Sequence, residues 1–209
     1  MSLLFDFIQR GGLLMLPIVL CSIIGLAIFI DRSVRLRRSA RANAGFLDQI
    51  RGNIRVGKIE DALGICRSSQ SPIAAVFAAG LRRVGDGEAA TRQAIEDAGR
   101  KETADLEKNL GGLATIAGGA PLLGFLGTVL GMIEAFQTVE RLGGNVNASV
   151  LAGGIWQALL TTAAGLAVAV PAYFAHNFLY DRIQSQVHAM EERSRELMLL
   201  LVTGDESIL

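Results

Sequence analysis

Three long runs without a charged residue constrain the fold of this chain more than any other feature of its sequence. The runs cover residues 11–30, 109–133 and 142–180, and they are 20, 25 and 39 residues long. About 20 predominantly apolar residues in a helix are enough to cross the hydrocarbon core of a bilayer. The third run begins with polar residues, so its apolar part starts near Val150. We therefore predict an all-α polytopic membrane protein with transmembrane helices at residues 11–30, 109–137 and 150–180.

The positive charges of the chain are segregated, although its net charge is zero. Of the 20 Lys and Arg residues, 18 lie between residues 31 and 108 or after the third predicted span. The positive-inside rule then places both regions in the cytoplasm and a loop at residues 138–149 on the outer side of the membrane. We expect a cytoplasmic helical domain at residues 31–108, a cytoplasmic C-terminal helix at residues 181–209, and an N-terminus on the outer side in which residues 1–10 form an interfacial segment.

A cluster of arginines directly follows the first predicted span. It consists of Arg32, Arg35, Arg37, Arg38 and Arg41. Binding of nucleic acid or of anionic lipid is an alternative use of such a cluster. A basic segment beside an apolar span is more typical of a cytoplasmic membrane anchor, and this cluster is the strongest single indication of orientation.

Two of the predicted membrane helices should extend far beyond the bilayer. From residue 88 a helical pattern continues without a proline as far as Pro121, so we expect one unbroken helix over residues 88–136, roughly 70 Å long. The third helix should likewise continue past Asp181 to about Leu201. The rest of the predicted cytoplasmic domain should consist of shorter helices at residues 31–53, 54–67 and 72–84.

Glycines line one side of the second predicted span. Gly124, Gly127 and Gly131 are three and four residues apart, which places them on one stripe of a helix. Small residues in this pattern let neighbouring membrane helices approach closely. Thr128 lies beside the stripe. Its hydroxyl either bonds back to its own helix, which is common for threonine in a membrane, or faces a polar path between helices.

The third predicted span also carries hydroxyl groups at membrane depth. Thr161 and Thr162 lie among alanine and glycine residues. Thr128 is about eight residues from the outer end of its helix and Thr162 about twelve from the start of its own, so antiparallel helices would bring the two hydroxyls to similar depth. We expect them to form a hydrated contact or a surface where an ionisable group of a partner docks.

These two spans resemble the MotA/TolQ/ExbB proton channel family, in its three-helix ExbB and TolQ branch. The resemblance rests on the strings APLLGFLGTVLGM at residues 120–132 and ALLTTAAGLAVAVPA at residues 158–172, together with Phe136. It implies a ring-forming homopentamer whose second and third helices line a pore. That pore would hold an ExbD/TolR-like single-span partner with a membrane aspartate, which acts in turn on a TonB/TolA-like protein.

By motif position, Thr128 and Thr162 match the pore threonines of the family, and Pro121 and Pro171 match its helix prolines. The resemblance implies a proton path along the pore, and one position departs from the family: Gln157 stands where members usually carry a glutamate. Glu134 is either a compensating acid in the pore or an ordinary interfacial carboxylate. The predicted proton path comprises Thr128, Thr162, Thr161, Gln157 and Glu134. The residues predicted to serve helix packing are Gly124, Gly127, Gly131, Gly165, Pro121 and Pro171.

The predicted function is that of a subunit in a motor driven by the proton-motive force in the bacterial inner membrane. The sequence has no Walker loop, no nucleophile paired with a base and no metal-ligand spacing, so we expect neither an enzyme nor a cofactor or nucleic-acid partner. Within the family an ExbB-like role, energising transport across the outer membrane, is favoured. The alternatives are a TolQ-like role in envelope integrity and division, and a non-conducting membrane scaffold.

Overall fold

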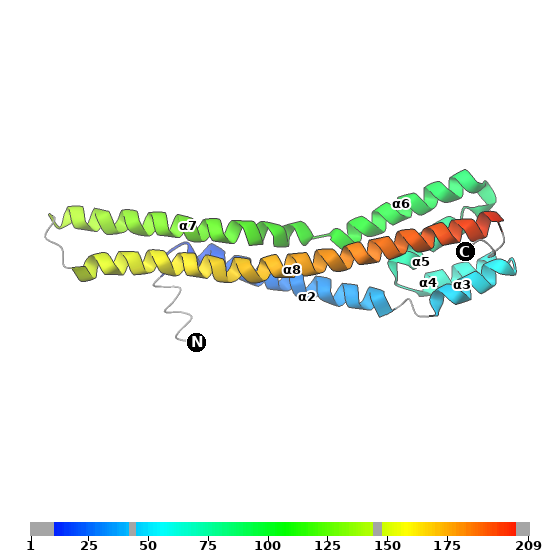
Figure 1. Cartoon of the computed structure of the whole chain (residues 1–209), viewed down its shortest axis with the longest axis horizontal. Coiled ribbons are helices and arrows are strands. Elements are labelled where there is room, and N and C mark those ends of the chain that lie inside the picture. Colours follow the sequence, from blue (N-terminus) through cyan, green and yellow to red (C-terminus); the bar gives the residue numbers. More distant parts are fainter. Residues whose placement is uncertain (1–10, 42–44, 144–147, 204–209) are drawn as a thin grey trace. The chain divides into compact units, whose positions relative to one another are not determined.

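A computed structural model of the chain describes residues 11–41, 45–143 and 148–203. All regular secondary structure within these ranges is helical (Figure 1). Three segments are long and apolar enough to cross a membrane, which confirms an all-α polytopic membrane protein. The predicted interfacial segment at residues 1–10 lies outside the described residues. The helices are α2 (Met15–Arg41), α3 (Phe46–Arg55), α4 (Ile59–Ser68), α5 (Pro72–Leu81), the 3₁₀ turn η1 (Val84–Asp86), α6 (Glu88–Glu107), α7 (Leu110–Arg141) and α8 (Ala148–Thr203).

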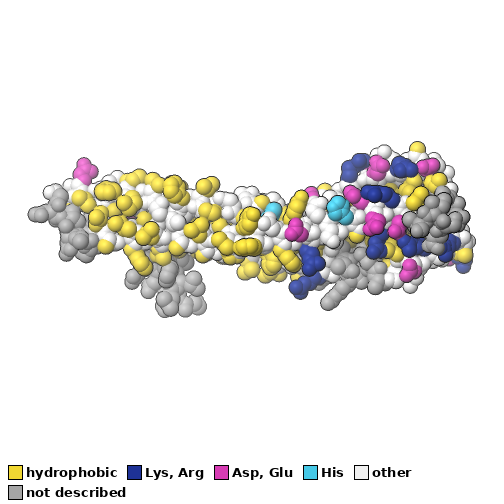
Figure 2. Space-filling view, in the orientation of Figure 1, with side chains coloured by type: hydrophobic (Ala, Val, Ile, Leu, Met, Phe, Trp, Pro, Cys, Tyr) yellow, Lys and Arg dark blue, Asp and Glu magenta, His cyan; other side chains and the backbone are white. Residues whose placement is uncertain are grey.

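The described chain divides into two compact units of different composition. The apolar unit comprises the described parts of Met1–Ile30 and Asn109–Phe178. The charged unit comprises the described parts of Asp31–Lys108 and Leu179–Leu209. On the face that Figure 2 shows, most of the exposed side chains of the apolar unit that are coloured by type are hydrophobic, whereas most of the Lys, Arg, Asp and Glu lie over the charged unit.

In the apolar unit, α7 and the first part of α8 run side by side (Figure 1), and α2 packs against α7. A Cβ atom built on Gly25 of α2 would lie 3.6 Å from the side chains of Leu113 and Ile116 in α7. Large apolar residues such as Leu122 and Phe125 remain exposed on the outward side of α7. This is the surface expected of helices surrounded by lipid or by other membrane helices.

The charged unit has a conventional hydrophobic core centred on α5. Seven of the ten α5 residues are buried. The helix begins at Pro72, directly after Ser71, as predicted, because proline fits the first helical position where no amide donor is needed. The residues that α3, α4, α6 and α8 contribute to this core include Phe46, Leu47, Ile50, Leu63, Cys66, Ile95, Met190 and Leu197.

The predicted helices at residues 31–53 and 54–67 are wrong, because two glycines with positive φ divide this region differently. Helix α2 ends at Arg41, and Gly45, at φ 77°, precedes the start of α3. Gly57, at φ 72°, separates α3 from α4. The amides of Gly57 and Lys58 donate to the carbonyl oxygens of Ile54 and Asn53, which is the Schellman arrangement that ends a helix at a left-handed glycine.

The prediction of one unbroken helix over residues 88–136 is also wrong. Helix α6 ends at Glu107 and α7 begins at Leu110. Between them Lys108 is extended, with ψ 136°, and Asn109 is left-handed, with φ 63°. Asparagine tolerates this conformation better than most residues with a side chain. By contrast, α8 does continue without a break past the apolar run, from Ala148 to Thr203.

Candidate functional site

The contact between α7 and α8 is made through backbone rather than through large side chains. A Cβ atom on Gly127 would lie 2.5 Å from the Thr161 hydroxyl oxygen, and one on Gly131 would lie 2.9 Å from the Ala158 Cβ. A Cβ on Gly165 of α8 would lie 2.5 Å from the Ala120 carbonyl oxygen in α7. Real Cβ atoms do not approach other atoms this closely, so these positions accept no side chain at the present helix spacing.

Gly124 belongs to the same contact. A Cβ on this residue would lie 3.0 Å from the Thr161 carbonyl oxygen and from the Thr162 Cα. The two prolines of the predicted packing set, Pro121 in α7 and Pro171 in α8, lie inside continuous helices. Each removes one amide donor from its helix without ending it.

The hydroxyl of Thr162 crosses from α8 to α7. Its Oγ1 donates to the carbonyl oxygen of Gly124 at 2.8 Å. The hydroxyl of Thr128 donates to the carbonyl oxygen of Phe125, in its own helix, at 2.6 Å. Because the two acceptors are consecutive residues of α7, the Thr128 and Thr162 hydroxyls lie at the same level of that helix.

Thr161 occupies a different environment from its neighbour. It is buried, with 1% of its surface exposed. Its hydroxyl donates back to the carbonyl oxygens of Gln157 and Ala158, at 3.0 and 2.9 Å. This hydroxyl is therefore bonded within α8, and it lies opposite Gly127 in the contact between the two helices.

Thr128 lines a groove of about 610 Å³ on the outward side of α7. The sequence analysis did not single out two polar residues of this groove, Gln137 and Glu140. Helical spacing could have found them, since positions 129, 133, 137 and 140 form one stripe. The groove is lined by Thr128, Val129, Met132, Ile133, Phe136, Gln137 and Glu140.

The two remaining predicted site residues lie away from this groove. Glu134 is exposed and six residues from Thr128, which places it roughly 120° around α7, and it does not line the groove. The Gln157 side chain lies against the backbone before α2, where a Cβ on Gly12 would be 2.6 Å from Gln157 Nε2. The structure thus brings Thr161 and Thr162 to the α7–α8 contact and leaves Thr128 in the groove on the outward side of α7, away from Glu134.

Comparison with known proteins agrees with this architecture. The sequence pattern of the MotA/TolQ/ExbB proton channel family matches residues 68–192, more than half of the chain. This region includes α5, at the centre of the charged unit's core, together with the whole of α7 and the groove on its surface.

Relatives over most of the chain carry the same family names. A Methanothermobacter thermautotrophicus protein named as an ExbB homolog is 26% identical over 89% of this chain, and the match spans 66% of its own length. The ExbB-like 1 protein of Synechocystis sp., named for biopolymer transport, is 30% identical over 94% of this chain and 78% of its own. The Tol-Pal system protein TolQ of Haemophilus influenzae is 30% identical over 89% of this chain and 86% of its own. This chain therefore belongs to the MotA/TolQ/ExbB proton channel family, as an ExbB/TolQ-like energiser subunit.

Proposed function

We propose that this protein is the ExbB-like subunit of a motor driven by the proton-motive force. In this proposal it forms a pentameric channel in the inner membrane around an ExbD/TolR-like partner and energises transport across the outer membrane through a TonB/TolA-like protein. Its N-terminus is periplasmic and its C-terminus cytoplasmic. Support comes from the family membership, from the three membrane-spanning segments and from the segregation of Lys and Arg.

The observation that carries the proposal is the pair of hydroxyls at one level of α7. Thr128 and Thr162 donate to the consecutive carbonyl oxygens of Phe125 and Gly124, and Thr128 also faces an open groove. A hydroxyl can rotate between a carbonyl and a carboxylate acceptor. A partner aspartate docked in the groove would accept a strong, charge-assisted hydrogen bond when ionised and only a weaker, neutral one when protonated, so the strength of its attachment to α7 would depend on its charge.

The proton-motive force supplies the work in this scheme. One elementary charge crossing 100 mV releases about 2.3 kcal/mol, so several protons are needed for a large movement. The glycine contact between α7 and α8 holds the hydroxyls in place. Thr161 serves packing in this scheme, and Gln157 holds the start of α2 through its contact with Gly12. Glu134 remains an interfacial carboxylate, because it lies on another side of α7 from Thr128.

The decisive test replaces Thr128 by valine in the complete membrane complex with its partner. Valine keeps the shape and removes the hydroxyl. A motor should assemble normally and lose about tenfold or more of its proton-driven output, because a hydrogen bond to a charged group contributes about 1.5–3 kcal/mol. Native mass spectrometry would report assembly, and proton flux into proteoliposomes would report output. Normal output with normal assembly would overturn the proposal.

Two carboxylate variants refine the proton path. Glu134→Gln should leave proton flux unchanged, whereas a loss of flux would restore Glu134 to the path. Glu140→Gln changes a carboxylate that lines the Thr128 groove, and it should lower flux if protons enter along the groove. Both residues lie near the outer end of α7 and are exposed, so each variant is a control for the other.

Two alternatives have a specific observation in their favour. The 30% identity to a TolQ protein supports a TolQ-like role in envelope integrity and division. A gene deletion that makes the envelope leak, but leaves energised uptake intact, would favour that role. The hydrogen bonds from Thr128, Thr161 and Thr162 to carbonyl oxygens within the chain support a non-conducting scaffold, which would function normally with valine at residue 128.

A further inference from the structure

The chain passes between the apolar and the charged unit in three places, and one of them differs from the other two. In α2 and in α8 the passage lies inside a continuous helix. The third passage, between α6 and α7, is broken at Lys108 and Asn109. A helix that ends leaves its last four carbonyl oxygens without helical partners, so the end of α6 needs donors from elsewhere.

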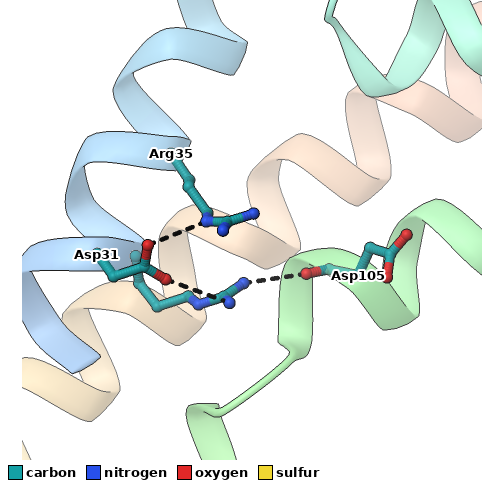
Figure 3. A network of polar contacts seen from close by, with 4 residues as sticks. Asp31, Arg35 and Asp105 are labelled. Carbon is teal, nitrogen blue, oxygen red and sulfur yellow. Dashed lines mark hydrogen bonds and ion pairs between the residues drawn. The ribbon is translucent and has the colours of Figure 1, made fainter.

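Arg32 of α2 supplies one of these donors. Its Nη1 donates to the carbonyl oxygen of Asp105, in the last turn of α6, at 3.0 Å. Its Nη2 lies 3.3 Å from Asp31 Oδ2. The other carboxylate oxygen of Asp31 accepts from Arg35 Nε at 3.1 Å (Figure 3). The network therefore joins two carboxylate oxygens, two guanidinium groups and one backbone carbonyl.

Arg32 is buried far more deeply than its neighbour in this network. Only 4% of the Arg32 side chain is exposed, compared with 67% of Arg35. Burying a guanidinium group is costly unless its donors find partners. The Nε of Arg32 and the hydroxyl of Ser33 have no hydrogen-bond partner among the described residues. Burial of apolar surface therefore does not explain why a charged residue, Arg32, occupies this position.

Helix α8 also makes a polar contact with α2 close to Arg32. Gln186 of α8 donates from Nε2 to the carbonyl oxygen of Leu36, one turn beyond Arg32, at 3.2 Å. Its Oε1 has no partner among the described residues. Helices α2, α6 and α8 of the charged unit are thus tied here by side chains that bond to backbone carbonyl oxygens.

We propose that Arg32 is a positioning residue that fixes where α6 ends. Its guanidinium holds the carbonyl oxygen of Asp105 to α2 and is itself held by Asp31. In an unbroken helix the Asp105 carbonyl would instead accept from the amide of Asn109, four residues later. A planar guanidinium can donate to two partners in different directions, which a lysine ammonium does less well. This inference does not depend on the proposed motor function.

Hydrogen exchange of the full-length protein in nanodiscs tests the proposal. In Arg32→Gln the amides in the last turn of α6 should exchange about tenfold faster than in the wild type, because the bond from a charged donor is lost. Amides of α5 should be unaffected. Arg32→Lys should recover part of the protection, since lysine keeps a charged donor. Unchanged exchange in Arg32→Gln would overturn the proposal.

Three further variants separate positioning from general loss of folding. Arg35→Gln removes the exposed arginine that pairs with the same Asp31, and it should exchange like the wild type. Asp105→Ala removes a side chain but keeps the backbone carbonyl, so it too should match the wild type. Asp31→Asn retains Arg32 and its bond to Asp105, so it should give a smaller acceleration than Arg32→Gln. This variant keeps the proposal testable if Arg32→Gln fails to fold. Equal acceleration in Arg35→Gln or Asp105→Ala would contradict the assignment to Arg32.

Discussion

Each of the two units of this protein has its own kind of internal packing, and the two kinds are opposite. In the charged unit, large side chains such as Phe77 and Ile50 fill a closed core, and both are at most 3% exposed. In the apolar unit the tightest contacts involve glycines such as Gly127 and Gly165, while large side chains such as Phe125 point outward. The comparison shows that large residues pack inside a unit surrounded by water, whereas small residues pack inside a unit surrounded by lipid.

The physical reason is the loss of the hydrophobic effect between helices in lipid. In water, burying a large apolar side chain contributes about 1.5–3 kcal/mol, so the charged unit gains by placing its largest residues inside. In a bilayer the same side chain is equally well solvated by lipid tails, and close backbone contact and hydrogen bonds become decisive. Large-to-small changes should therefore damage one unit, and small-to-large changes the other.

The largest expected effect of this comparison is at Phe77. Replacing this buried α5 residue with alanine should lower the free energy of unfolding of the charged unit by about 4 kcal/mol, through lost burial and a cavity. Amide exchange of α5 in the full chain would measure the loss. The matched control is Phe125→Ala, because Phe125 is 66% exposed in the apolar unit and should cost little. An equal loss of protection in both variants would break the comparison.

In the apolar unit, a substitution of a small residue by a larger one should be destabilising. Gly165→Ala puts a Cβ 2.5 Å from the Ala120 carbonyl oxygen and should destabilise the α7–α8 pair by about 2 kcal/mol. Denaturation in mixed micelles, followed by the fluorescence of the single tryptophan, Trp156, would report this loss. Gly118→Ala is the control, because nothing lies within 4 Å of its added Cβ. It should be neutral or stabilising, since alanine favours a helix over glycine.

A third effect, of similar size but dependent on pH, should be confined to the charged unit. Burial raises the pKa of the Cys66 thiol from 9.0 to about 11. The unfolded chain therefore releases this proton first, so the contribution of the neutral thiol to stability is complete below pH 9 and is lost as the pH rises to about 11. The loss should be about 2 kcal/mol. Denaturant unfolding across this range should show a steeper decline in the wild type than in Cys66→Ala, and identical slopes would contradict it.

The sequence correctly predicted three helices apolar enough to span a membrane, but it predicted the helix ends poorly. Runs without charge are a direct requirement of the bilayer, so all three spans could be read from them. Helix ends depend on single residues such as Gly45, Gly57 and Asn109, which tolerate positive φ but do not require it. No pattern in the sequence shows which of the residues that tolerate a positive φ actually adopt one.

The candidate site and the Arg32 network likewise differ in how far the sequence predicts them. The level of Thr128 and Thr162 followed from counting residues along two antiparallel helices, and the structure gives their acceptors at consecutive positions of α7. The role of Arg32 could not be predicted, because its partner is a backbone carbonyl 73 residues away and carries no side-chain signature.

The break between α6 and α7 also has a consequence for how the length of this chain can vary. One residue inserted into a continuous helix turns everything beyond it by about 100° and moves it by about 1.5 Å. Insertions or deletions where α2 and α8 pass between the units would thus rotate one packed face away from its neighbours. At Lys108 and Asn109 the backbone already departs from the helix, and an added residue there can be absorbed locally. Among these three passages, this is where natural variation in length should be found.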